Sequence, residues 1–248
     1  WPENVCCMKA QAYGMLEAGR SFSRQAVSLQ TENAQVAACY ARLLQEICHI
    51  PHILCQEPPA EAASHKAYHT VLVPEEKDRL RVLEQFGHSA NEVALRLNRA
   101  NLDCECCPSA YLRGAFLACG AVTDPQTDYH MEFNIPYYNL SRDLVTLLRE
   151  TGLAAKMVQR KGTHVVYLKE SEQIEDCLTL MGAQNAALEM MNVKILKDIR
   201  NTANRITNCE NANIDKTVAA SMIQLEAVRR IEQTCGLDGL PEDLRELA

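Results

Sequence analysis

Apolar residues recur every three or four positions in some segments of the chain and every second position in others. In residues 34–48, Val36, Tyr40 and Leu43 would lie on one face of a helix. In residues 130–135, apolar and polar side chains alternate, which predicts a strand with one buried side. In the first part of the chain the pattern predicts helices at 6–19, 34–48 and 74–87, and strands at 21–31, 52–56 and 68–73. An extra strand within residues 21–30 is the alternative for the first of these strands.

The same order of elements returns at an offset of roughly 100 residues, longer than the period of solenoid repeats. Residues 12–22 align without gaps with residues 112–122, so that Gly14 matches Gly114 and Ala18 matches Ala118. On a helix, this spacing puts two small residues on one face, where another backbone can approach closely. The second copy is predicted to contain helices at 111–122, 140–150 and 171–181, and strands at 130–135, 155–160 and 164–168.

Beyond Gly182 the repeat ends and the pattern is purely helical. Residues 191–206 place Val193, Leu196 and Ile199 at helical spacing, and we expect these side chains to face inward. A second helix is expected from Asn213, a good N-cap residue, to about residue 233, with a last short helix at 241–247. Between the two repeats, residues 88–103 have a mixed pattern and join the halves, with Val93, Leu95 and Leu97 expected on a helix.

Composition fits a globular protein that works in a reducing compartment. The 248 residues are 47% hydrophobic and carry a formal net charge of −7. An acidic chain can bind DNA through a local basic patch, but not by attraction of the whole molecule to phosphate. The chain has no apolar run of transmembrane length and no leader-like start, and its twelve cysteines lack any mark of secretion. We therefore expect a cytoplasmic protein without membrane contact.

Several motifs carry a resemblance to a known family. They are YLRGAFLA at 111–118, YLKESEQI at 167–174, MGA at 181–183, NR at 204–205 and NCENAN at 208–213. The duplicated glycine-containing helices resemble those of LAGLIDADG homing endonucleases, and the full set of motifs resembles the WhiA family over essentially the whole chain. The resemblance implies a DNA-binding transcriptional regulator of sporulation and cell division in Gram-positive bacteria. It also implies a LAGLIDADG-like domain joined to a C-terminal helix-turn-helix domain.

The expected fold is therefore α+β, a pseudo-two-fold LAGLIDADG-like duplication of αββαββα halves followed by a partial, all-α helix-turn-helix domain. The family's recognition helix is expected to lie beyond the last residue, Ala248. The expected parts are a first half at 1–87, an inter-half linker at 88–107, a second half at 108–182, linker helices at 183–208 and the truncated start of the C-terminal domain at 209–248.

The motif positions that would carry catalysis are not acidic. In nuclease members, each motif helix ends in a carboxylate that holds Mg²⁺ near the scissile phosphate. Gly19 and Cys119 occupy these positions here, and neither offers an oxygen ligand. The nearest acids are Asp124, past the second motif helix, and Glu17, on a different helix face from position 19. We expect no catalytic residue and no enzyme activity; the alternative is an active LAGLIDADG endonuclease.

The resemblance implies double-stranded DNA as the partner, bound mainly through the C-terminal region expected beyond Ala248, and therefore a nucleoid-associated protein. RNA polymerase holoenzyme is a further candidate partner. We expect a monomer, because a duplicated chain supplies both halves itself. Solvated basic faces are the alternative interpretation of the charged residues, and a protein-interaction or effector-sensing module is the alternative function. The candidate DNA-binding residues are Lys156, Arg160, Lys161 and Lys169 on the second hairpin, and Arg200, Arg205 and Lys216 in the C-terminal helices.

Two cysteine pairs precede the motif helices at equivalent points, Cys6-Cys7 and Cys106-Cys107, with Cys104 nearby. If the helices start at one end of the domain, four thiols could approach one another, and four thiolates are a good zinc set. The two pairs lack the CxxC spacing of zinc ribbons, however, and buried small residues beside the helix interface explain them better. We therefore expect no metal and no cofactor.

Overall fold

The computed structural model describes residues 2, 4–57, 68–92, 94–234, 236, 239 and 241–242. The chain forms two units, Trp1–Met191 and Asn192–Ala248, and each is described by itself. The expected loop around Pro58 and Pro59 lies outside the described residues, as does almost all of the helix expected at 241–247.

The first repeat folds in the order αββαββα. Its first sheet has the strand order β1-β2-β4-β3, and all neighbouring strands are antiparallel. Residues 21–31 contain the extra strand of the alternative prediction: they form two strands, because the chain turns back between Phe22 and Val27. The elements are α1 (Val5–Glu17), β1 (Ser21–Phe22), β2 (Val27–Thr31), α2 (Ala34–Cys48), β3 (Leu54–Gln56), β4 (His69–Leu72) and α3 (Glu76–Gln85).

The second repeat has the same element order, and its sheet has the equivalent strand order β5-β6-β8-β7. The expected duplication is thereby confirmed. The predicted hairpin turn is also present: Lys161 and Gly162 have positive φ angles of 48° and 84°, as a two-residue hairpin loop requires. The elements are α4 (Cys107–Cys119), β5 (Gly120–Val122), β6 (Met131–Ile135), α5 (Tyr138–Glu150), β7 (Lys156–Arg160), β8 (Thr163–Leu168) and α6 (Ser171–Leu180).

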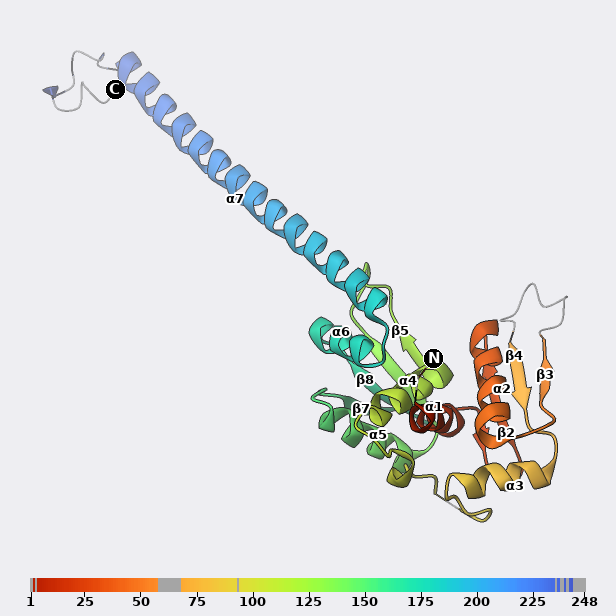
Figure 1. The fold of residues 1–248 in the computed structure, drawn as a ribbon. Helices are drawn as coiled ribbons and strands as arrows, with labels where there is room; N and C mark the ends of the chain where they lie inside the picture. The colour runs from red at the N-terminus through yellow and green to blue at the C-terminus, as the bar shows by residue number, and fades with distance from the viewer. Residues whose placement is uncertain are drawn as a thin grey trace. The chain divides into compact units, whose positions relative to one another are not determined.

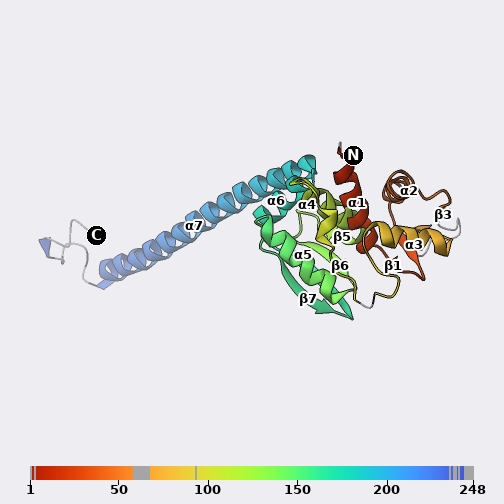
Figure 2. The ribbon, with the colours of Figure 1, turned by 60° about the horizontal axis from the view of Figure 1, so that its bottom comes forward.

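The motif helices α1 and α4 pack against each other between the two sets of elements (Figures 1 and 2). A Cβ added at Gly14 would lie 2.2 Å from the carbonyl oxygen of Tyr111, and one added at Gly114 would lie 2.1 Å from that of Gln11. The two contacts are equivalent under the offset of 100, so each glycine makes room for the partner helix's backbone. This reciprocity is the packing role that the repeated small residues predict.

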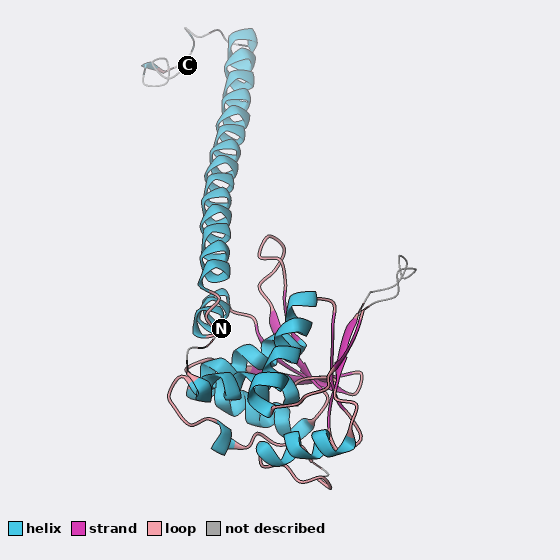
Figure 3. Cartoon of the chain, turned by 45° about the vertical axis from the view of Figure 1, so that its right-hand side comes forward, coloured by secondary structure: helices cyan, strands magenta, loops and turns pink. Residues whose placement is uncertain are grey.

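Each sheet turns one face to the helices and leaves the other to solvent (Figure 3). In β6, Met131, Phe133 and Ile135 are buried, whereas the residues between them are partly exposed. In the first repeat, the Asn33 side chain accepts hydrogen bonds from the first amides of α2, which starts that helix where the sequence predicts. The buried face of α2, including Tyr40 and Leu43, is part of the core.

The prediction of a helix around Leu95 and Leu97, within the connecting segment 88–103, is wrong for the described residues. Among the described residues of this segment, the only helical turn is the 3-10 turn η1 (Arg99–Asn101). Polar side chains hold the segment in an irregular path instead: the Asn98 and Asn101 amides both donate to the carbonyl oxygen of Phe86, at 3.0 and 2.9 Å. Such side chain–backbone bonds compete with a helical backbone.

The two helices expected beyond Gly182 form one helix, α7 (Gln184–Thr234), which passes through Asn213 without a break. The side chains expected to face inward are exposed: Leu196, Ile199 and Ile214 have exposed fractions of 60%, 61% and 59%. Ala187 and Met190, near the start of α7, are buried, but from Asn192 onward the apolar stripe of this helix has no core to cover it within the described residues. None of the helices in the described part of the chain is both long and apolar enough to cross a membrane.

Candidate nucleic-acid interface

The ends of the two motif helices carry no carboxylate that could hold a metal ion at a phosphate. Gly19 follows α1, and a Cβ there would lie 2.9 Å from the carbonyl oxygen of Met15 and 3.1 Å from that of Ser28. An acidic side chain does not fit at this position unless the backbone shifts. Cys119 is the last residue of α4, and burial raises the pKa of its thiol to about 12. Neither position suits Mg²⁺, which prefers oxygen ligands.

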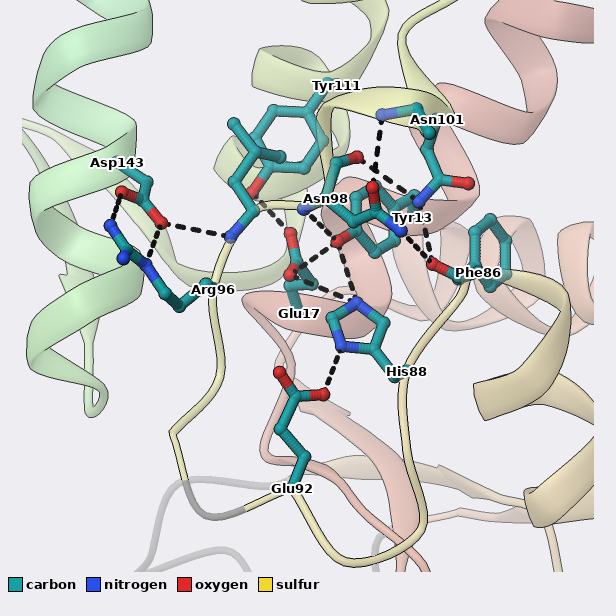
Figure 4. A network of polar contacts seen from close by, with 12 residues as sticks. Tyr13, Glu17, Phe86, His88, Glu92, Arg96, Asn98, Asn101, Tyr111 and Asp143 are labelled. Atoms are coloured by element: carbon teal, nitrogen blue, oxygen red, sulfur yellow. Dashed lines mark hydrogen bonds and ion pairs between the residues drawn. The ribbon is translucent and has the colours of Figure 1, made fainter.

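Glu17, the acid nearest to these ends, is fully buried in a polar network between the motif helices (Figure 4). Its two carboxyl oxygens accept hydrogen bonds of 2.8 Å from the hydroxyls of Tyr13 and Tyr111. Tyr13 belongs to the same helix and Tyr111 to the partner helix, so the carboxyl group ties the two repeats together. Its position excludes direct contact with DNA.

The surroundings of Glu17 favour its protonated form. Burial raises the pKa of this carboxyl group well above its usual range, and the tyrosine hydrogen bonds offset this only in part. The Nε2 atom of His88 lies 2.8 Å from the hydroxyl of Tyr13 and 3.7 Å from Glu17 Oε1, and its Nδ1 atom lies 2.7 Å from Glu92. The network is thus a buried structural contact between linker and helices.

The exposed face of the second sheet brings several of the predicted basic residues together. In the register of this sheet, Lys156 pairs with Tyr167, which also pairs with Glu132 on the other side. Arg160 lies on the same face at the far end of β7, because side chains alternate along a strand. The Nζ atom of Lys169 lies 5.5 Å from the centre of the Tyr167 ring. This basic face, defined by Lys156, Arg160 and Lys169, has an aromatic ring at its centre.

Glu132 partly neutralises the basic face. Its carboxylate accepts from His130 at 2.9 Å and from the Asn134 amide at 3.0 Å, and it lies 3.6 Å from Arg160. The hydrogen bond with His130 lowers the pKa of Glu132, which therefore stays ionised. A groove of about 360 Å³ follows these groups; it is lined by Ala121, Val122, Thr123, Asp128, His130, Glu132, Arg160 and Lys169.

The remaining basic candidates lie apart from this face. Lys161 occupies the turn between β7 and β8 and is exposed. Arg200, Arg205 and Lys216 are exposed on α7. Arg205 and Lys216 are about three helical turns apart and share one side of α7, whereas Arg200 points to another side.

The first sheet offers DNA a different surface. Its strands β1–β4 contain no lysine or arginine in the parts of the chain described. Two arginines flank β1: Arg20, just before it, forms a hydrogen bond with Gln30, and Arg24, in the turn before β2, forms an ion pair with Glu76. The contrast between the two sheets agrees with the sequence, which has basic residues on the second hairpin.

Four cysteines come together near the starts of the motif helices, but one of them differs from the expected set. Cys6, Cys7 and Cys107 lie together at the start of the motif helices, but Cys106 is exposed and Cys104 takes its place. Cys104 and Cys107 have the CxxC spacing that the two adjacent pairs lack. Comparing the adjacent pairs alone missed this relation, although the spacing is present in the sequence.

Sequence reasoning also missed His130, Glu132 and Tyr167 as neighbours of the basic face. Only the strand register places them beside Lys156 and Arg160. Alternation along 130–135 and 164–168 gives the outward-facing residues, but not which of them pair.

The fold and this site define a LAGLIDADG-like protein whose motif helices end without acidic residues. The family models that match are the WhiA LAGLIDADG-like domain, over residues 108–200, and the WhiA C-terminal HTH domain, over residues 203–248. The chain belongs to the WhiA family.

Curated relatives support the same family over nearly the whole chain. The chain is 38% identical to "Probable cell division protein WhiA" of Ruminiclostridium cellulolyticum, covering 98% of this chain and 79% of the relative. It is 36% identical to the protein of the same name from Caldicellulosiruptor saccharolyticus, covering 99% and 78%.

A solved structure shows the same fold. The full-length DUF199/WhiA protein of Thermatoga maritima aligns with a TM-score of 0.63 at 19% identity, covering 100% of this chain and 80% of that one. The relatives are named for cell division, and none of these names describes an enzyme.

Proposed function

We propose that this chain is a DNA-binding transcriptional regulator of sporulation and cell division, with an endonuclease-like part that serves as a scaffold and does not cut DNA. The observation that carries the proposal is the pair of helix ends at Gly19 and Cys119, where the fold is kept and the metal-binding oxygens are absent. The match of a helix-turn-helix family model to residues 203–248 supports a remaining role in DNA binding.

The basic face of the second sheet suits phosphate contact. Lys156, Arg160 and Lys169 are exposed on or beside one sheet, where they could follow a backbone of regularly spaced negative charges. Lys161, in the hairpin turn, extends this set. Phosphate contacts position a protein on DNA without reading its sequence, so base recognition falls to the helix-turn-helix region.

On α7, Arg205 and Lys216 share a side and form the second proposed contact, with Arg200 as a separate one. We place the protein in the cytoplasm, on the chromosome, as a monomer that acts beside RNA polymerase holoenzyme.

A salt series on duplex DNA tests the proposal. We expect binding to weaken steeply with salt, and the variant Lys156→Gln/Arg160→Gln/Lys169→Gln to reduce the slope of log K against log salt by about 2–3. The matched control is Arg42→Gln/Lys77→Gln/Arg81→Gln, which removes the same charge from α2 and α3. Supercoiled plasmid with Mg²⁺ or Mn²⁺ should stay uncut.

Each assay has an outcome against the proposal. Equal losses for the two triple variants would mean that only net charge matters and that the second sheet is not the contact surface. Nicking that depends on the divalent ion would restore the endonuclease alternative.

The net charge of −7 and the lack of lysine and arginine in β1–β4, where described, favour a second candidate, a protein-interaction or effector-sensing module. Undetectable DNA binding at low salt would select it.

A further inference from the structure

Four thiols from two distant parts of the chain meet where the motif helices begin. Cys6 and Cys7 lie in the first turn of α1, Cys107 is the first residue of α4, and Cys104 lies in the turn before it. The sulfur of Cys104 is 3.6 Å from those of Cys6 and Cys7 and 3.3 Å from that of Cys107. We propose that Cys6, Cys7, Cys104 and Cys107 bind one zinc ion in a tetrahedral four-thiolate site.

The distances suit a shared ion. Zinc bound to four cysteines has Zn–S bonds of about 2.3 Å, which puts the sulfur atoms about 3.8 Å apart in a regular tetrahedron. All four sulfurs of the cluster lie within 4.8 Å of one another, so closing the separations by about 1 Å or less brings them to one centre. A disulfide requires sulfurs about 2.05 Å apart, which none of these contacts approaches.

The spacing of the ligands is also that of a zinc site. Cys104 and Cys107 form a CxxC pair in a tight turn, in which the Cys107 amide donates to the Cys104 carbonyl oxygen at 3.0 Å. Such turns hold two thiolates on one side of an ion in structural zinc sites. Adjacent Cys6 and Cys7 complete the set, because α1 begins directly against this turn.

Two helix N-termini face the cluster and favour its charged form. Zinc with four thiolates has a net charge of −2, and each helix end contributes a partial positive charge of about one half. Both α1 and α4 are 13 residues long, so each supplies a full macrodipole. Cys7 and Cys107 are buried, whereas Cys6 and Cys104 are partly exposed, which shields the ion and still leaves it a path of entry.

The ion would hold the two repeats together. Cys6 and Cys7 belong to the first repeat, and Cys104 and Cys107 lead into the second. The cluster lies at the N-terminal end of the helix pair, about 18 Å along the helices from the ends at Gly19 and Cys119. Its role is therefore structural and independent of DNA contact at the other end.

Metal analysis of untagged, full-length chain, purified under reducing conditions without chelator, tests the site. We expect about one equivalent of zinc per chain, and X-ray absorption showing four sulfur neighbours at about 2.3 Å. Zinc below about a tenth of an equivalent, in protein that also fails to take up added zinc, would overturn the proposal. Iron in place of zinc, or nitrogen and oxygen neighbours, would overturn the assigned ion or its ligands.

Variants separate this site from the other cysteines. Cys104→Ser should lower zinc content at least about tenfold and lower the Tm, because a ligand is lost. Cys106→Ser is the matched control: the residue lies between two proposed ligands yet is exposed, and zinc content and Tm should not change. Equal zinc in both variants would contradict the assignment. Should Cys104→Ser fail to fold, stoichiometric zinc in Cys106→Ser supports the site, and loss of zinc there contradicts it.

Discussion

At the scale of single residues, the centre of the molecule depends on two glycines and one glutamate. Gly14 and Gly114 each face a carbonyl oxygen of the partner helix at a distance that excludes a Cβ. Because the obstructing atoms are backbone atoms, no side-chain movement relieves the clash. The helices would have to separate and lose the packing on which both repeats depend.

Alanine at either glycine tests this packing. We expect Gly14→Ala and Gly114→Ala each to lower the free energy of unfolding by about 3 kcal/mol or more, measured by urea denaturation. Gly152→Ala is the control. No atom lies within 4 Å of an added Cβ there, so only the positive φ of 88° opposes alanine, at a cost of about 1 kcal/mol. Similar losses at all three positions would show that close helix contact is not the cause.

Glu17 makes stability depend on pH. Its raised pKa means that the folded protein keeps a proton that the unfolded chain releases above the ordinary value of 4.5. Stability contributed by this group is therefore complete below pH 4.5 and falls as pH rises towards the folded pKa, by up to about 1.4 kcal/mol per pH unit.

Glu17→Gln removes this titration, so its stability relative to wild type should rise with pH from about 4.5 upward in urea denaturation series. Glu150→Gln should differ in sign and in pH range, because the hydrogen bond with Arg99 lowers the pKa of Glu150. Its stability relative to wild type should fall as pH rises towards about 4.5 and stay constant above that pH. Parallel pH profiles of wild type and Glu17→Gln would mean that the buried carboxyl group does not titrate in this range.

At the scale of elements, the sequence predicts whatever depends on local pattern. The alternation in β6, the cap at Asn33 and the turn at Lys161 and Gly162 all act within a few residues, and each is where the pattern places it. The path of 88–103 depends on buried partners far along the chain, such as Phe86 for Asn101. Likewise, Cys104 joins the cysteine cluster in place of Cys106 because of how the turn before α4 packs against α1.

The exposed part of α7 depends on intrinsic helix propensity alone, which leads to a prediction. Residues 201–213 contain five asparagines and two threonines, which are weak helix formers. We expect their amides to exchange with deuterium much faster than those of α1. Asn208→Ala/Asn211→Ala should slow that exchange, since each alanine adds about 0.5 kcal/mol of helix stability. Protection equal to that of α1 would reveal a packing partner for this segment.

At the scale of the whole molecule, the two repeats share a scaffold but differ in charge. Basic side chains gather on the second sheet, whereas β1–β4 contain no lysine or arginine where described. The chain as a whole has a net charge of −7. Composition alone indicates that the chain as a whole repels nucleic acid, whereas only the fold shows that the basic side chains share one face. Any DNA contact by this unit is therefore expected through the second sheet and not through the first.

The network around Glu17 has a consequence for the history of the chain. Under the offset of 100, the counterparts of Tyr111, Tyr13 and Glu17 are Gln11, Arg113 and Leu117. A chain built from two copies of the first repeat would lose the hydroxyl that Tyr111 donates to Glu17 and would acquire a second glutamate at the same depth. The duplicated repeats have thus become complementary parts, and neither can now replace the other.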